Sequence, residues 1–335
     1  MDIARRPTLK DVARAAGVSL ASASYAVNGS GSVGEATRAH ILQVAADLGY
    51  RPNTSAKAMK TGRTGVLGLV LPDLTNPFFP SLAQAVLQTA RRQGYNVLLA
   101  DTGGAPEEER TAIRFLMDQG VDGLLWFPID DSNPKGRRPV PEMDRIPVVV
   151  LDRNLPDYDV VLADYALGGQ LAAEHLIAAG HVDIGVIAGP RAASSARDRA
   201  EAAVAVVQRQ GRLVWTVENA FSLDLDPATT AALERREVTA VIAGSDMIAI
   251  GAMRHLQTLG LKVPDDVSIV GFDDIPWAAL STPPLTTIDM PIEAMAVSAI
   301  ETLVQRIAEG PGTRSRTVFD VSLVERGSVR TIAGA

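Results

Sequence analysis

Residues 8–28 read TLKDVARAAGVSLASASYAVN, and this stretch decides how the first part of the chain folds. Apolar residues at positions 9, 12, 13 and 16 recur at helical spacing and predict a short amphipathic helix, which Thr8 can cap with Asp11 near its positive end. Gly17 supplies a turn, and Ser19 can cap a second helix that follows at once. Two helices joined in this way are typical of the helix-turn-helix, whose second helix enters the major groove of DNA.

The second predicted helix presents small and polar side chains, which are expected to face base edges and the DNA backbone. The apolar side chains of Leu20 and Ala21 would contact thymine methyl groups or read shape rather than donor and acceptor patterns. A third helix is expected over about 35–48, with Ile41, Leu42, Ala45 and Leu48 as its core stripe. A helix-turn-helix that serves packing alone is the alternative. The candidate DNA-binding residues here are Thr8, Ser19, Leu20, Ala21, Ser22, Ser24, Tyr25 and Asn28.

The stretch GSGSVG at residues 29–34 formally matches the dinucleotide-binding pattern G-x-G-x-x-G. That chemistry requires a strand before the glycines and a βαβ unit around them. A helix is expected before this stretch, and no strand is expected until about residue 66. The pattern therefore favours a flexible loop between two helices.

Charge is distributed unevenly along the chain. The net charge is −7, yet residues 1–63 hold nine Lys and Arg against four Asp and Glu, while the remainder holds 23 against 35. A basic end on an acidic body is expected where only that end meets phosphate groups. A hydrophobic fraction of 47% predicts buried cores, and the absence of cysteine excludes disulfides and thiolate chemistry. Without a signal-peptide pattern or an apolar run of roughly 18 residues, the expected location is the cytoplasm.

A short segment follows the third predicted helix. Pro52 discourages helix at Arg51 and permits it onward, so Asn53 to Lys60 could form two helical turns. Such a segment is far below the ~12–15 residues of a marginally stable isolated helix, and it is expected to fold on DNA. A solvated linker over 53–63 is the alternative.

From Val66 onward, short apolar runs alternate with helical stretches, which indicates buried parallel strands. Two βα successions of similar size predict two doubly wound lobes with a ligand cleft at the carboxyl ends of the strands. The predicted fold class is an all-α helix-turn-helix head followed by an α/β body of two parallel-sheet lobes. Strands are expected at 66–71, 96–100, 123–127, 148–151, 184–188, 240–243 and 268–271, and helices at about 79–93, 106–119, 166–179, 196–210, 226–235, 246–259 and 291–309.

Four motifs of the head closely resemble those of the LacI/GalR family of bacterial repressors: TLKDVARAAGVS at 8–19, S-x-S-Y-A-V-N at 22–28, E-A-T-R at 35–38 and L-G-Y-R-P-N at 48–53. The resemblance implies a hinge helix that begins near Asn53, enters the minor groove and wedges an apolar side chain into a base step. Met59 stands where the family has leucine, and Lys57 and Lys60 would hold the flanking phosphates. Tyr25 stands where many members carry arginine, which leaves the bases that are read undetermined.

The body is similar to the periplasmic-binding-protein fold that this family uses for its effector domain, in which the chain crosses between lobes three times. We place the crossings near residues 164, 289 and 322. The expected domains are a head at 1–51, a hinge at 52–63 and an effector-binding and dimerisation domain at 64–335. Within the last, the N-lobe would hold about 64–164 plus 290–321, and the C-lobe about 165–289 plus 322–335.

Candidate effector residues follow the predicted strands. The strings N-P-F-F, L-D-R, S-A-R-D-R and G-F-D look like those of ribose-type sugar-binding proteins, and aromatic faces with Asp and Arg pairs suit a polyhydroxylated ligand. Departures at Ser245, Ala202 and Asp289 leave open whether the ligand is ribose itself. The expected effector-binding residues are Asn76, Phe78, Phe79, Asp152, Arg153, Ser195, Arg199, Phe221, Asp246, Asp273 and Asp289.

Several of these residues also have a purely structural interpretation. Phe78 and Phe79 could belong to the core, and Asp152 or Arg199 could form salt bridges between lobes. Asp246 is expected to cap the following helix more than to touch ligand. Phe221 could equally be ordinary packing.

No motif of catalysis stands out. The four histidines lack a metal-binding spacing such as H-E-x-x-H, and neither a G-x-S-x-G elbow nor a P-loop is present. Asp273 and Asp274 are adjacent and face different ways, which makes a poor acid/base pair. We therefore expect no enzyme activity, no cofactor and no metal.

The sequence predicts a homodimeric transcriptional regulator, in particular a repressor, that binds a pseudo-palindromic operator. A small-molecule effector, expected to be a monosaccharide, would change lobe closure and thereby the spacing of the two heads. No membrane partner is expected. Two alternatives remain: a sugar-binding transport receptor, which leaves the basic head unexplained, and a regulator that senses a non-sugar ligand or a protein.

Overall fold

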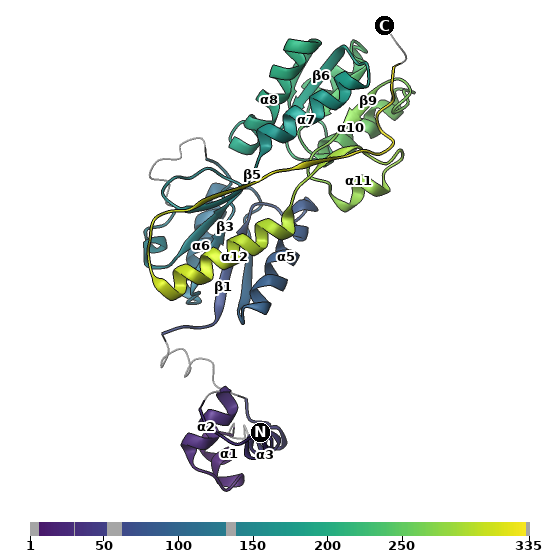
Figure 1. Ribbon diagram of the computed structural model, residues 1–335. Coiled ribbons are helices and arrows are strands. Elements are labelled where there is room, and N and C mark those ends of the chain that lie inside the picture. The colour runs from purple at the N-terminus through teal and green to yellow at the C-terminus, as the bar shows by residue number, and fades with distance from the viewer. Residues whose placement is uncertain (1–6, 30, 52–61, 132–138, 333–335) are drawn as a thin grey trace, which may run out of the picture. The chain divides into compact units, whose positions relative to one another are not determined.

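The computed structural model describes residues 7–29, 31–51, 62–131 and 139–332 (Figure 1). The chain divides into two compact units, residues 1–64 and residues 65–335. The predicted hinge residues Asn53, Lys57, Met59 and Lys60 lie outside the described residues.

Three helices form the first unit: α1 (Leu9–Ala15), α2 (Leu20–Asn28) and α3 (Glu35–Asp47). Both predicted caps are confirmed. The backbone N–H of Asp11 donates to the Thr8 hydroxyl at 3.4 Å, and the Asp11 carboxylate accepts from the Thr8 backbone at 2.9 Å, so the pair forms a capping box. Ser19 accepts from the backbone of Ser22 at 3.0 Å. The described residues of the glycine-containing stretch connect α2 to α3, so the predicted position between two helices is confirmed.

Small side chains fill most of the core of this unit, which contains fully buried Val12, Ala23 and Ile41. The predicted core stripe of α3 is half correct. Ile41 and Ala45 are buried, but the side chains of Leu42 and Leu48 are 45% and 38% exposed. Leu42 lies about 100° around the helix from Ile41, and Leu48 is the C-terminal cap residue, so half-buried Val44 packs on the core instead.

The second unit contains a six-stranded parallel sheet in the order β11-β5-β4-β3-β1-β2. Leu67, Leu69 and Leu71 of β1 pack in one cluster with helices α5 and α12, whereas Val70 packs in another with α6 and η1. The sheet is therefore covered on both faces, as its continuous apolar strands require. The elements are β1 (Val66–Leu71), α5 (Phe78–Arg92), β2 (Asn96–Asp101), α6 (Pro106–Asp118), β3 (Gly123–Trp126), η1 (Pro141–Arg145), β4 (Val148–Leu151), β5 (Asp159–Ala163), α12 (Ile292–Glu309) and β11 (Arg316–Phe319).

A four-stranded parallel sheet in the order β7-β6-β8-β9 forms the other lobe. Helices α7 and α8 cover one face, while α9 and α10 pack with the residues of the opposite face. The elements are α7 (Tyr165–Ala178), β6 (Asp183–Ala188), α8 (Ser194–Gln210), β7 (Arg212–Glu218), α9 (Pro227–Glu234), β8 (Ala240–Ala243), α10 (Asp246–Thr258), β9 (Ser268–Val270) and α11 (Pro276–Leu280).

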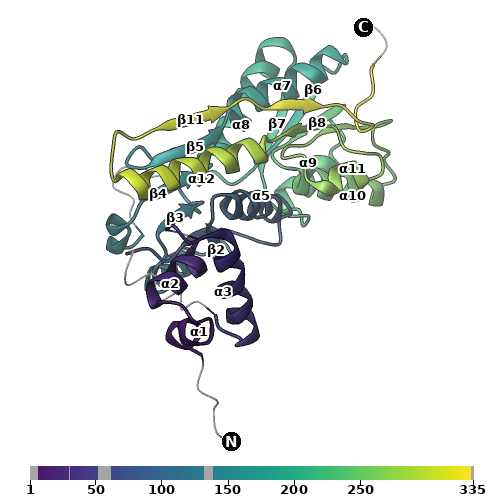
Figure 2. The same cartoon turned by 60° about the horizontal axis from the view of Figure 1, so that its bottom comes forward.

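The chain passes between the two sheets after β5, after β10 (Thr287–Asp289) and after β11. β10 pairs antiparallel with β12 (Ser322–Val324). Figures 1 and 2 both show β11 extended along β5, with the chain then running on to the other lobe. Five strands were not predicted from the sequence: β5, β7, β10, β11 and β12. β10, β11 and β12 are only three or four residues long, and β7 and β11 are partly exposed strands at sheet edges, so these four lack the continuous apolar run of a central strand. β5 is different: it is a buried five-residue strand between β4 and β11, and its apolar run at 160–163 was overlooked.

Candidate effector site and DNA-facing helix

Two aspartate residues of the expected effector site lie just after strands and have left-handed backbone conformations. Asp152 follows β4 with φ 64°, and Asp273 follows β9 with φ 107°. Among the described residues only four non-glycine positions have positive φ: these two, the neighbouring Asp274, and Arg236 elsewhere in the chain. Such backbone costs on the order of 1–3 kcal/mol per residue and clusters at functional sites. The strain points to the expected site independently of its side chains.

Arg153 connects the two lobes. It forms an ion pair with Asp152, and its Nη1 donates to the hydroxyl of Ser195 at 2.9 Å. The guanidinium carbon of Arg153 lies 4.7 Å from the ring centre of Phe127. Arg153 follows a strand of the six-stranded sheet, whereas Ser195 begins the helix α8 of the other lobe. The structure thus brings these predicted residues together across the interface between lobes.

Arg199, one turn further along α8, holds the other side of the site. Its Nη1 donates to the backbone oxygen of Gly244 at 2.6 Å and to the Asp273 carboxylate at 3.3 Å. Its guanidinium carbon lies 4.0 Å from the ring centre of Phe272, 4.7 Å from that of Tyr165 and 5.7 Å from that of Phe221. We call Asp152, Arg153, Ser195, Arg199 and Asp273 the interlobe cluster.

A glycine allows this position of Arg199. A Cβ atom on Gly169 of α7 would lie 2.0 Å from the backbone oxygen of Arg199, a distance that no side chain could occupy. Helices α7 and α8 therefore approach closely, and the approach fixes the turn of α8 that carries Arg199.

Burial dominates the electrostatics of the interlobe cluster. It raises the pKa of Asp152 to about 6, although Arg153 and Arg199 oppose the shift. It raises the pKa of Asp273 to about 7, again against the neighbouring Arg199. Both carboxyl groups can therefore exchange protons close to neutral pH.

Asp246 does not cap α10 as expected. Ser245 is the cap residue and accepts from the backbone of Ile248 at 3.3 Å. Asp246, fully buried, accepts from the hydroxyl of Thr287 at 2.5 Å and from the backbone of Ile275 at 2.9 Å. Burial and the nearby Asp273 carboxylate raise its pKa well above the usual range. Asp246 thus ties together the segments that support Asp273.

The remaining predicted effector residues lie around the cluster in different ways. Phe78 and Phe79 are buried and form edge-to-face contacts with Phe127, the ring beneath Arg153. The Asn76 side chain accepts from the backbone of Phe78 at 3.1 Å, so it caps its own turn. Asp289 is half-buried and forms a backbone bridge with Asp273.

Sequence reasoning missed three aromatic residues that contact the cluster. Tyr165 directly follows the predicted first crossing, and its ring stacks on Phe272 at 5.9 Å. Phe272 lies inside the G-F-D string, and Phe127 directly follows β3. Their positions after strands or crossings were the available signal.

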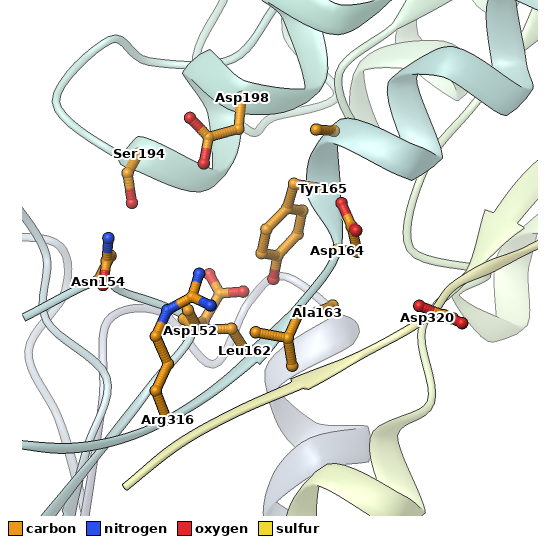
Figure 3. Close-up of a pocket in the computed structure, with 12 residues that line it drawn as sticks. Asp152, Asn154, Leu162, Ala163, Asp164, Tyr165, Ser194, Asp198, Arg316 and Asp320 are labelled. Carbon is orange, nitrogen blue, oxygen red and sulfur yellow. The ribbon is translucent and has the colours of Figure 1, made fainter. Parts of the chain in front are cut away.

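A cavity of about 450 Å³ lies beside Asp152 (Figure 3). Its walls come from the end of β5, the first turns of α7 and α8, and β11. We call it the crossover pocket, defined by residues 162–166, Asp152, Asn154, Ser194, Asp198, Arg316, Val318 and Asp320.

The first turns of α2 carry the predicted DNA-binding residues. The side chains of Leu20 and Tyr25 are 46% and 47% exposed, and Ala21 is exposed as well. Asn28 donates to the backbone oxygen of Ser24 at 2.9 Å, so its amide is partly engaged within the helix. The Thr8 hydroxyl bonds to Asp11 at 2.6 Å.

No helix in the described part of the chain is long and apolar enough to cross a membrane. Within the same residues, no group of three or more His, Asp or Glu side chains is arranged to hold a metal ion.

A helix-turn-helix head joined to two parallel-sheet lobes, with a polar cluster between the lobes, defines the class of ligand-responsive transcriptional regulators. Residues 8–53 match bacterial regulatory proteins of the lacI family, and residues 173–329 match the periplasmic-binding-protein-like domain. The chain is 37% identical to the HTH-type transcriptional regulator MalR of Streptomyces coelicolor, over 97% of both chains. The chain belongs to the lacI family, as its motifs predicted.

Solved structures agree with this assignment. The lac repressor dimer bound to operator and the anti-inducer ONPF matches with a TM-score of 0.85 and 28% identity, over 97% of this chain and 100% of that one. A LacI family transcriptional regulator from Enterococcus faecalis with bound ribose matches with a TM-score of 0.71 and 28% identity, over 80% of this chain and 99% of that one. The predicted fold class and the predicted regulator function are confirmed.

Proposed function

We propose that a small polyhydroxylated effector, of the monosaccharide class, binds at the interlobe cluster and controls how a dimer of this chain holds its operator. The hydrogen bond from Arg153 to Ser195 carries this proposal, because it joins residues of different lobes within one buried polar site. A ligand that inserts its hydroxyl groups there must alter the contact between lobes. The effector-binding residues named from the sequence are proposed on this basis.

The proposed DNA contacts rest on the exposed first turns of α2 and on the basic charge of residues 1–63. The lac repressor relative is described as a dimer bound to operator, which supports a homodimer on a pseudo-palindromic site. We propose the hinge role of Asn53, Lys57, Met59 and Lys60 from the sequence alone. Because the proposed partner is chromosomal DNA, we place the protein in the cytoplasm.

We also propose the domain division at residues 1–51, 52–63 and 64–335, with the three crossings between lobes given above. The relatives reported are regulators rather than enzymes, and we propose no enzyme activity for this chain. The ribose held by the Enterococcus faecalis regulator supports a sugar as the effector class.

The DNA-binding part of the proposal is tested by operator selection. The full-length protein is used to enrich binding sites from a random DNA library, and affinities are measured by fluorescence anisotropy at fixed salt. We expect a two-fold symmetric site bound by two chains, with binding weakened by Tyr25→Ala on α2. Arg209→Ala, an exposed change at the far end of α8, is the control. Enrichment of asymmetric sites, or equal weakening by both variants, would contradict the proposal.

A further inference from the structure

The aromatic ring of Tyr25, on α2, lies against a glycine of the loop that follows this helix. A Cβ atom added to Gly31 would lie 2.6 Å from the Cγ atom of the ring and 2.8 Å from each of its two Cδ atoms. Because the two Cδ distances are equal and barely longer than the Cγ distance, the added atom would sit over the face of the ring rather than at its edge. The ring of Tyr25 therefore occupies the space that a side chain at residue 31 would need.

Two glycines of the loop hold Tyr25 from different sides. Gly29 ends α2 with a φ of 67°, and its backbone N–H donates to the backbone oxygens of Ala26 and Tyr25. Gly31 has a φ of 72° and meets the ring of Tyr25. Left-handed backbone of this kind is open to glycine and rarely adopted by residues with a side chain. The glycines thus let the chain turn back against the helix that it has just left.

The ring leaves α2 on the face proposed to contact DNA. Ala21, Tyr25 and Asn28 are four and three residues apart, so they lie on one side of the helix, and all three are exposed. Ala23 and Ala26 on the other side are buried in the core of the head. Tyr25 itself is 47% exposed, so the ring has one face on Gly31 while much of it stays accessible.

The contact limits the conformations open to the Tyr25 side chain. A tyrosine side chain has two rotatable χ angles, and an exposed one on a helix ordinarily changes rotamer freely. Carbon atoms in contact prefer a separation of about 3.5–4.0 Å, so a methyl group at residue 31 would displace the ring or the loop by about 1 Å. Glycine at residue 31 therefore permits the position of the ring that the structure shows.

We propose that Gly31 is a positioning residue for DNA reading, which holds the ring of Tyr25 where it meets the base edges of the operator. The phenol group can donate to or accept from a base edge, and the ring can contact a thymine methyl group. Each requires the ring in a fixed place. This inference rests on the proposed DNA contact of Tyr25 and adds the residue that sets its geometry.

Base preferences test this role on the full-length protein. The selected operator is altered one base pair at a time, and each affinity is measured by fluorescence anisotropy at fixed salt. The base pairs read by Tyr25 are those whose preference disappears in Tyr25→Ala, where a good side-chain contact discriminates by about 5- to 150-fold. Gly31→Ala should lower the preference at the same base pairs at least about fivefold and leave the other base pairs unchanged.

A second glycine of the head provides a matched control. Gly49, just after α3, has a φ of 65°, and a Cβ atom added to it meets nothing within 4 Å. Gly49→Ala therefore introduces a similar backbone strain without touching Tyr25, and it should leave every base preference intact. Binding to non-specific DNA at low salt should be the same for all variants, because it depends on phosphate contacts and on a folded head.

A double variant shows whether Gly31 acts through the ring. When Tyr25 is already alanine, the ring that a methyl group would displace is gone. Gly31→Ala should then change operator affinity by less than about twofold, whereas in the unsubstituted protein it should weaken specific binding at least about fivefold. Such non-additivity is the signature of two residues that act as one unit.

Four results would overturn the inference. They are unchanged base preferences in Gly31→Ala, an equal change in Gly49→Ala, an equal effect of Gly31→Ala with and without the ring, and loss of non-specific binding in Gly31→Ala, which would give Gly31 a role in folding alone. If Tyr25→Ala keeps every base preference, the ring reads no base and the inference is overturned as well. Operator binding by the unsubstituted protein, and its response to an effector, would stand in each case, so this failure is distinguishable from failure of the proposed regulator function.

Discussion

Replacing Asp131 with alanine is expected to separate the two lobes, because this buried carboxylate caps a helix of the lobe opposite its own. Asp131 lies beyond β3 of the six-stranded sheet and is 3% exposed. It accepts from the backbone of Ser194 at 2.7 Å and also from the Ser194 hydroxyl. Ala193, the N-terminal cap residue of α8, forms no side-chain cap of its own. The N-terminus of α8 therefore depends on the other lobe for its cap.

The expected magnitude follows from these contacts. Loss of an N-terminal cap costs about 0.5–2 kcal/mol, and a hydrogen bond to a charged group contributes about 1.5–3 kcal/mol. Because α8 can bind water in place of the lost cap, we expect the contact between lobes to weaken by about 2 kcal/mol, or about thirtyfold in population. Asp131→Asn keeps one acceptor oxygen and should produce a smaller effect.

Fluorescence energy transfer measures this change without a ligand, because the chain has no cysteine and accepts a pair of introduced labels. Arg91→Cys on α5 and Arg209→Cys on α8 place one label on an exposed position of each lobe. Asp131→Ala should shift the transfer efficiency toward a more separated population. Asp226→Ala is the control, because Asp226 occupies the cap position of α9 and makes no side-chain cap bond. Identical transfer efficiencies for Asp131→Ala and the unsubstituted protein would refute the reasoning.

Three further outcomes are expected. Asp159→Ala should reduce the free energy of unfolding in urea by about 3–5 kcal/mol, since fully buried Asp159 holds Arg306 at 2.8 Å and the backbone of Ser315 at 2.8 Å; a loss below about 1 kcal/mol would contradict this role. Burial raises the pKa of Asp273 to about 7, so the folded protein binds a proton at this carboxyl group more tightly than the unfolded chain does. The stability that this proton contributes is therefore lost as pH rises from about 4 through about 7. Asp273→Asn should make the urea midpoint less dependent on pH over that window, and an unchanged pH dependence would exclude the raised pKa. Met59→Ala should weaken operator binding in a salt-controlled shift assay and leave effector affinity unchanged, so unaltered operator affinity would exclude the wedge role.

Local chemistry made much of the fold predictable. Thr8 and Ser19 cap helices because their side-chain oxygens accept hydrogen bonds from backbone N–H groups of the first turn, which have no partner within the helix. The strand β1 was predictable from its continuous apolar run. Where tertiary contacts decide the outcome, the sequence was insufficient. Asp246 was expected to cap α10, but its neighbour Ser245 is the cap residue. Asp246 instead accepts hydrogen bonds from the Thr287 hydroxyl and the backbone of Ile275.

The candidate site shows the same division. Asp152 was found because it directly follows a strand, and Arg199 because it lies on the helix after another strand. Ligands of parallel sheets bind at the carboxyl ends of the strands. Tyr165 was missed because its role depends on the crossing between lobes, which brings its ring to Arg199 from a different element. Asp198 stands within the S-A-R-D-R string, and only the structure shows that it lines the crossover pocket.

The most direct test of the central claim is operator affinity of Arg199→Ala with and without an effector, measured by fluorescence anisotropy on the full-length protein. Arg199 belongs to the interlobe cluster and contacts Asp273, Gly244 and three aromatic rings, and none of the proposed DNA contacts involves it. Without effector, the operator affinity of Arg199→Ala should be close to that of the unsubstituted protein, and added effector should not change it. Arg209→Ala on the same helix should respond to effector normally. An Arg199→Ala protein that responds to effector as the unsubstituted protein does would contradict the claim.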